Sequence, residues 1–247
     1  MKWINASLCF LTFSLPVFSA SAQVQAQSHP ITKTWQISQA FKPPERGTPT
    51  TTIGGASRGS TCLKEKKELK GLIPENKLGL TFAEHPTFYW SVPPTTVKTA
   101  QLTLFTDQDK KVHYETTFTI PNQAGIISFT IPADAPPLEV GKTYHWYLSL
   151  VCDDLDFSNN PRVEGWVERT QPESPLLEKL AKADLQKLPS LYAEAGIWYE
   201  ALDSLVQLRR SQPNNVKTRI NWRQFFNSVG LSAIANEPLI DCCQPQN

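Results

Sequence analysis

The stretch from Gly54 to Cys62, GGASRGSTC, combines glycines, one arginine and a cysteine, which are residue types that could do chemistry. A phosphate-binding loop needs a lysine followed by Ser or Thr after its final glycine, and here Gly59 is followed directly by Ser and Thr. A reactive Cys62 needs a nearby base. Arg58 could lower the pKa of the thiol, but no histidine lies close in the sequence. We therefore expect a structural role for this stretch.

Cysteine pairing offers that role. The cysteines beyond the first are Cys62, Cys152, Cys242 and Cys243, which allow three intramolecular pairings and include no C-x-x-C spacing. We predict a Cys62–Cys152 disulfide that fastens the glycine-rich stretch to a sheet and contributes on the order of 4 kcal/mol. A bond between the adjacent Cys242 and Cys243 would close a strained ring, so a distant partner or another chain is geometrically easier for each, and their pairing stays open.

Acidic and histidine side chains give weaker patterns. Residues 152–160, CDDLDFSNN, could offer oxygen ligands to calcium, but they lack the glycine and distal glutamate of an EF-hand, so a solvated loop is favoured. His85, His113 and His145 lie in three separate segments without metal-ligand spacing, and the last two are expected on the face opposite the core. We expect no metal, no cofactor and no catalytic residue.

Aromatic residues offer a binding chemistry instead. Tyr89, Phe105 and Tyr147 alternate away from the predicted core residues of their strands. Exposed rings of this kind stack on sugars or contact proteins. The alternative, which we favour, is that helices after residue 172 cover this face.

The elements that would position these residues are strands between residues 61 and 170. Seven short apolar or β-branched segments, divided by Pro, Gly, Asn and Asp, predict a β-sandwich. Trp90 and Trp146 resemble the facing aromatic pair of fibronectin type III and immunoglobulin-like sandwiches. Alternation assigns the following residues to the core: Phe88, Trp90, Val112, Tyr114, Phe118, Ile120, Tyr144, Trp146, Leu148 and Leu150.

Residues 171–247 change to a helical pattern, which makes the predicted class α+β. Gly196, Ala201 and Pro213 fall where a single tetratricopeptide-like unit would end its first helix, allow close contact and stop its second helix. This helical pair is expected to pack internally, with a partner-binding groove as the alternative. In an open groove, Trp198 and Tyr199 would be contact residues.

The N-terminal residues predict export. An apolar run and the small residues Ala20-Ser21-Ala22 indicate a signal peptide over residues 1–22, with an uncleaved anchor as the alternative, and residues 23–60 read as a flexible or loosely docked polar arm. Removing Lys2 leaves 24 − 1 = 23 basic residues against 23 acidic ones. A neutral chain lacks the field that draws proteins to nucleic acid, so we expect no such partner and no membrane span after cleavage.

Several sequence blocks carry a family resemblance. GGASRGSTC, LIPENKLGLTFAEHPTFYWSVP, GKTYHWYLSLVCDD and VEGWVER occur in that order between about residues 50 and 215. Together they resemble a cyanobacterial family of exported proteins catalogued as domain of unknown function 928. The resemblance implies an exported setting and this architecture, and it implies neither a reaction nor a ligand.

The sequence thus predicts a periplasmic or secreted, non-enzymatic binding or adaptor protein whose partner is another envelope protein. The alternative is a carbohydrate-binding module that uses Tyr89, Phe105 and Tyr147. A hydrolase ranks last because no nucleophile–base pair stands out in the sequence.

Overall fold

The structure, a computed structural model, describes residues 40–44, 62–63, 67–106, 108–153 and 159–243. All of them belong to one structural unit, residues 34–247. The predicted signal peptide, most of the predicted arm and the stretch GGASRGST lie outside the described residues.

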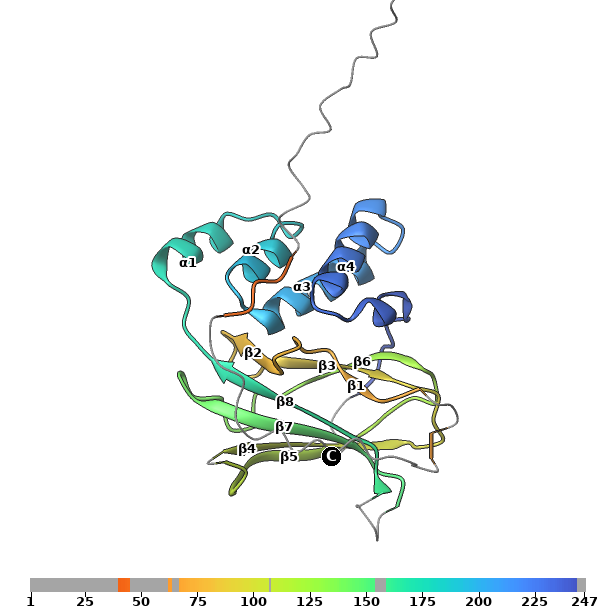
Figure 1. The fold of residues 1–247 in the computed structure, drawn as a ribbon. Coiled ribbons are helices and arrows are strands. Elements are labelled where there is room, and N and C mark those ends of the chain that lie inside the picture. The colour runs from red at the N-terminus through yellow and green to blue at the C-terminus, as the bar shows by residue number, and fades with distance from the viewer. Residues whose placement is uncertain (1–39, 45–61, 64–66, 107, 154–158, 244–247) are drawn as a thin grey trace, which may run out of the picture. The chain divides into compact units, whose positions relative to one another are not determined.

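Strands form two sheets, and all seven strands predicted from the sequence are present (Figure 1). In each sheet neighbouring strands are antiparallel, except that β2 runs parallel to β8. The five-stranded sheet has the order β2 (Leu78–Thr81), β8 (Arg162–Arg169), β7 (Thr143–Leu150), β4 (Thr99–Thr106) and β5 (Lys111–Thr119). The small sheet has the order β1 (Lys70–Gly71), β3 (Thr87–Val92) and β6 (Gly125–Thr130).

Helices follow the strands and lie on the side of the small sheet (Figure 1). Gly196, at φ +74°, ends α2 in the left-handed region that favours glycine. The Asn215 side chain caps α4 by accepting hydrogen bonds from the backbone N–H groups of Lys217 and Thr218. The helices are α1 (Ser174–Ala181), α2 (Leu188–Glu194), α3 (Trp198–Ser211), α4 (Val216–Ser228) and the 3-10 helix η2 (Ser232–Asn236).

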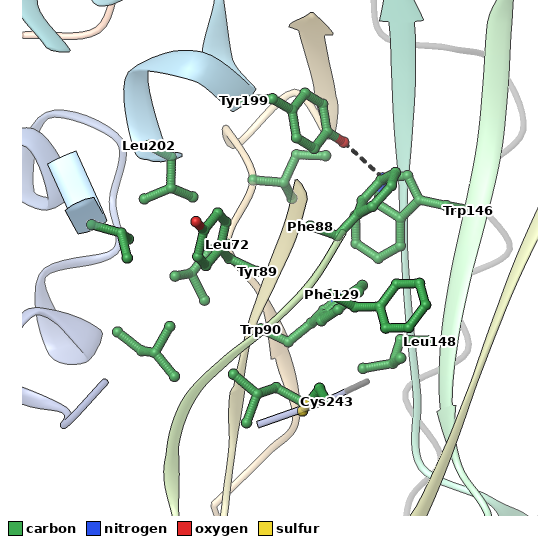
Figure 2. Close-up of a cluster of buried hydrophobic side chains, with 14 of the residues drawn as sticks. Leu72, Phe88, Tyr89, Trp90, Phe129, Trp146, Leu148, Tyr199, Leu202 and Cys243 are labelled. Carbon is green, nitrogen blue, oxygen red and sulfur yellow. Dashed lines mark hydrogen bonds between the residues drawn. The ribbon is translucent and has the colours of Figure 1, made fainter. Parts of the chain in front are cut away.

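Aromatic rings fill the space between the two sheets (Figure 2). The centroid of Trp146 on β7 lies 6.0 Å from that of Trp90 and 5.8 Å from that of Phe88, both on β3. Glycines on flanking strands make room for the Trp146 ring: a Cβ at Gly71 would lie 2.8 Å from it, and one at Gly165 would collide with it. The large buried rings that alternation assigned to the core, Phe88, Trp90, Tyr144 and Trp146, are therefore confirmed as core.

The helices share this core, so residues 61–170 and 171–247 are not separate hydrophobic units. Tyr199 on α3 reaches the inter-sheet core, where its hydroxyl accepts a hydrogen bond from Trp146 Nε1 at 3.1 Å (Figure 2). Trp198 Nε1 donates to the Leu72 carbonyl at 3.0 Å. At the start of α3, the Glu200 carboxylate accepts from the Thr81 hydroxyl at 2.7 Å. The element type changes between Arg169 and Ser174, close to the expected boundary at residue 170.

Strand β5 departs from the expected alternation. Val112 was predicted to be core, and it is 49% exposed, so that prediction is wrong. The register between β4 and β5 shifts at Leu104 and Phe105, where an irregularity pairs Tyr114 with Leu104 and Val112 with Phe105. Such an irregularity places the residues on its two sides on different faces of the strand, and alternation alone does not reveal it.

The end of the predicted helical region is extended rather than helical. Ile126 N–H donates to the Pro238 carbonyl, and Ile240 N–H donates to the Ile126 carbonyl, both at 2.8 Å. This C-terminal segment, residues 238–243, therefore lies along the edge of β6 in a parallel bridge.

Candidate functional site

A short segment of the predicted arm, residues 40–44, lies in a groove among α2, α3 and α4. Phe41 is 5% exposed, so this part of the predicted arm is packed against the folded chain. The centroid of the Phe41 ring lies 4.9 Å from that of Trp198 in an edge-on contact and 6.5 Å from that of Phe225. We call the site that receives this side chain the Phe41 groove.

Backbone hydrogen bonds hold the segment extended in the Phe41 groove. Lys42 N–H donates to the Ala193 carbonyl at the end of α2, at 3.1 Å. Phe41 N–H donates to the Ser228 hydroxyl of α4, at 3.2 Å. These two bonds bind main-chain groups, which any extended peptide offers, while the aromatic pocket selects the side chain.

Gly196 serves the Phe41 groove as well as ending α2. A Cβ at Gly196 would lie 2.9 Å from the Lys42 carbonyl oxygen and 3.4 Å from Pro44 Cδ. A larger residue at this position would therefore push the segment out of the groove. Glycine is required at this position for two independent reasons. The backbone is left-handed, and residues 42–44 of the same chain approach it closely.

Trp198 and Tyr199 would be contact residues only in the alternative of an open helical pair, and both are buried. Trp198 forms the wall of the Phe41 groove, stacked on Phe225 with centroids 5.1 Å apart, and the protein's own segment covers it. Tyr199 points the other way, into the sandwich. Their burial agrees with the favoured expectation that the helical pair packs internally, and the open alternative does not hold for these two residues.

A second group of polar side chains lies on the far face of the five-stranded sheet, the face turned away from the small sheet. Its centre is His145, which is 1% exposed and stacks on Trp166 with ring centroids 3.8 Å apart. His145 Nδ1 lies 2.9 Å from both carboxylate oxygens of Asp109 in the β4–β5 turn, so Nδ1 carries a proton and donates it. We call this group, with Tyr147 and Glu164, the far-face cluster.

Charge surrounds His145 on both sides of its ring. His145 Nε2 is buried without a hydrogen bond and lies 3.8 Å from Glu164 Oε2. Glu164 in turn pairs with Lys77 Nζ at 3.1 Å. Burial lowers the pKa of His145 below its usual value, and the hydrogen bond and charge of Asp109 oppose this shift. Burial and the neighbouring carboxylates therefore shift the pKa of His145 in opposite directions.

Tyr89 and Tyr147 were candidates for an exposed aromatic surface, with coverage as the favoured alternative, and both are buried. The hydroxyl of Tyr89 donates to Asp203 of α3. A helix therefore covers Tyr89, as the favoured alternative expected. The hydroxyl of Tyr147 donates to Asp109 Oδ2 at 3.0 Å. Phe105 is half-buried, with its ring edge-on to Tyr147. A sugar-stacking surface on all three rings is therefore not available, and sugar binding itself stays a prediction.

The cysteines that the structure describes form two disulfides. Cys62 is joined to Cys152, with Cα atoms 5.9 Å apart, which is the predicted pairing. Cys242 is joined to Cys243, a pairing that the sequence left open, although distant partners were considered geometrically easier. Arg58 lies outside the described residues.

Sequence reasoning missed Phe41, the far-face cluster and the adjacent disulfide. Phe41 has one signal in the sequence, because it is an aromatic residue with Pro43-Pro44 shortly after it. Asp109 has none, since its contact with His145 depends on how the β4–β5 turn folds back over the sheet. In the described ranges, no cluster of three or more His, Cys, Asp or Glu side chains could hold a metal ion.

Comparison with known proteins identifies the family. The family described as Domain of Unknown Function (DUF928) matches residues 53–239, which is most of the chain, so the chain belongs to that family. The match extends past residue 215 and includes α4 and η2. No curated protein matches the chain.

One solved structure with detectable similarity is the solution structure of the fn3 domain of human collagen alpha-1(XX) chain. It is 16% identical, covers 48% of this chain and 93% of its own, and superposes with a TM-score of 0.27. Within the part of the chain that the structure describes, no helix has the length and apolar character needed to cross a membrane.

Proposed function

We propose that this chain is a non-enzymatic, exported binding protein, periplasmic or secreted, that acts as an adaptor for another protein of the cell envelope. The observation that carries the proposal is the docking of residues 40–44 in the Phe41 groove. A groove that holds one extended segment by two backbone bonds and an aromatic pocket has the features of a peptide-binding site. The partner would present an aromatic residue followed by proline.

The finer architecture belongs to the same proposal. We infer a fibronectin type III or immunoglobulin-like sandwich, supported by the facing Trp90 and Trp146 and the two-sheet order. For the helices we infer a single tetratricopeptide-like unit made of α2 and α3, supported by Gly196 at the turn and by Ala201, which is fully buried between the helices and the sheet. The exported, cyanobacterial setting is supported by the predicted signal peptide and the sequence resemblance.

The chain's own segment sets the conditions for binding in trans. A tethered segment acts at an effective concentration in the millimolar range, so a free peptide with similar contacts would have to exceed that concentration to displace it. A partner peptide therefore needs either more contacts than residues 40–44 make or a chain in which that segment is released. Weakening the internal segment should expose the groove to an external one.

A binding experiment tests the proposal. In the full chain, Phe41→Ala removes the ring from the groove, and a fluorescently labelled peptide of sequence AFKPP is titrated while its anisotropy is measured. We expect saturable binding at least about tenfold tighter to the variant than to the unmodified chain, because the competing ring is absent. The peptide AAKPP, which lacks the aromatic ring, should not bind.

The control variant is Leu177→Ala on α1, a residue 50% exposed and outside the Phe41 groove, which should bind the peptide as weakly as the unmodified chain. Urea unfolding and near-ultraviolet circular dichroism establish that Phe41→Ala is folded. If the folded variant gives no saturable signal with AFKPP, or if AAKPP binds equally well, the groove is internal packing and the proposal is wrong.

A further inference from the structure

Cys242 and Cys243 end the C-terminal segment that lies along β6. Arg210 of α3 anchors this segment just before the pair, with Nη2 at 3.4 Å from the Ile240 carbonyl oxygen and at 3.0 Å from Asp241 Oδ1. Backbone bonds between Ile126 and residues 238 and 240 fix the same segment from the other side. The adjacent disulfide is therefore held in one place by contacts that do not depend on its own sulfur–sulfur bond.

The two sulfur-bearing residues have unequal surroundings. Cys243 is 8% exposed and belongs to the buried hydrophobic cluster, whereas Cys242 is only partly buried (Figure 2 labels Cys243). Cys243 has φ +80°, a left-handed conformation that is costly for a residue with a Cβ. Cys242 is therefore the more accessible of the two residues to an approaching thiolate, and opening the ring would allow Cys243 to leave its unfavourable backbone conformation.

The other disulfide differs in what it constrains. Cys62 and Cys152 are 90 residues apart, while Cys242 and Cys243 are 1 residue apart. A disulfide across a long loop stabilises the folded chain because it restricts the unfolded ensemble, and folding stabilises that bond to the same extent. A bond between neighbours restricts the unfolded ensemble very little. The folded structure should thus protect the Cys62–Cys152 bond from reduction much more strongly than the adjacent one.

We propose that Cys242–Cys243 is a site of thiol–disulfide exchange with small thiols or dithiols, while Cys62–Cys152 is a structural bond. A thiolate attacks Cys242 Sγ, forming a mixed disulfide there, and the Cys243 thiolate leaves and takes a proton from water. The second thiol of a dithiol then attacks the mixed disulfide and releases Cys242. The net reaction converts one protein disulfide and one dithiol into two protein thiols and one oxidised dithiol.

Differential reduction of the two disulfides tests this proposal. The folded full chain is equilibrated with increasing dithiothreitol, free thiols are alkylated, and each cysteine is quantified by peptide mass spectrometry. We expect half-reduction of Cys242–Cys243 at a dithiol concentration at least about tenfold lower than that for Cys62–Cys152. With a monothiol such as glutathione, the trapped mixed disulfide should lie on Cys242.

Two double variants give matched controls. Cys242→Ser/Cys243→Ser should lose the low-concentration step and keep the other, and Cys62→Ser/Cys152→Ser should do the reverse. The proposal is overturned if both bonds of the unmodified chain reduce together, if Cys62–Cys152 reduces first, or if glutathione is found on Cys243. Because the readout is cysteine chemistry, its failure would leave the peptide-binding proposal untouched.

Discussion

Tyr89 on the small sheet and Tyr147 on the five-stranded sheet both donate a hydroxyl hydrogen to an aspartate, but the two sides of the sandwich bury them differently. The acceptor of Tyr89 comes from α3, in a layer that is otherwise packed through apolar and aromatic side chains. The acceptor of Tyr147 comes from a turn of the same sheet, beside a buried histidine. One side therefore depends mainly on hydrophobic burial, and the other depends on the protonation of neighbouring groups.

Glu200 on the helical side and His145 on the far face are ionisable groups whose pKa values burial shifts in opposite senses. Burial raises the pKa of Glu200 on the helical side, although hydrogen bonds from Thr81 and the Phe82 and Ala83 N–H groups oppose the shift. Burial lowers the pKa of His145 on the far face. Both shifts favour the neutral form in the folded chain. The two sides should therefore respond to pH with opposite signs.

The largest expected effect is on the helical side. Tyr199→Ala removes a ring that packs edge-on to Phe88 with centroids 5.2 Å apart and joins α3 to the inter-sheet core. We expect a loss of about 3–5 kcal/mol in the free energy of unfolding, measured by urea titration, because a large cavity would remain. Tyr199→Phe is the matched control: it keeps the ring, leaves Trp146 Nε1 unpaired and should cost about 1–3 kcal/mol. Equal losses for the two variants would contradict the view that ring burial dominates here.

The far face should lose less when one of its groups is altered. Asp109→Asn keeps the shape of the side chain but removes the charge that accepts from both His145 and Tyr147. We expect a loss of about 1–3 kcal/mol at neutral pH, because a buried network loses charge-assisted bonds. Urea unfolding measures the loss, and Lys110→Ala in the same turn is an exposed control that should change stability little. No loss in Asp109→Asn would mean that the network contributes nothing to stability.

The smallest expected effect is the pH dependence. Because the pKa of His145 is lower when folded, the unfolded chain binds more protons below about pH 6.5, so His145 makes stability fall as pH drops through that value. The raised pKa of Glu200 acts in reverse: its contribution is complete below pH 4.5 and is lost as pH rises above it. Unfolding titrations at several pH values should show that His145→Gln removes part of the acid-side loss, and that Glu200→Gln flattens the decline above pH 4.5.

His113 shares the sign expected for His145, because burial lowers its pKa too. His113→Gln therefore separates the two histidines. If His145→Gln leaves the acid-side slope unchanged and His113→Gln removes it, the far-face cluster is not the titrating group, and the comparison between the two sides fails on that point.

Alternation of apolar residues was sufficient to predict the strands. Large apolar residues occur at every second position, as Phe88 and Trp90 do on β3, and their side chains face the core that Trp146 also enters. It failed at Val112, because a register shift in the β4–β5 pair is set by the partner strand. Helix ends were predictable at Gly196 because left-handed backbone strongly prefers glycine. Contacts between residues far apart in the sequence were not predictable, because spacing in the chain carries no information about them. Examples are the ring contact of Phe41 with Phe225 and the hydrogen bond of His145 with Asp109.

The parallel bridge between Ile126 and Leu239 has a consequence for dissecting the molecule. β6 is the last strand of its sheet, and residues 238 and 240 occupy hydrogen-bonding groups that it would otherwise present to solvent. A fragment cut after η2 would keep every helix and every labelled strand, and still leave a bare β6 edge open to pairing with other molecules. Such a fragment should self-associate, so fragment designs for this fold need to retain residues through at least Ile240.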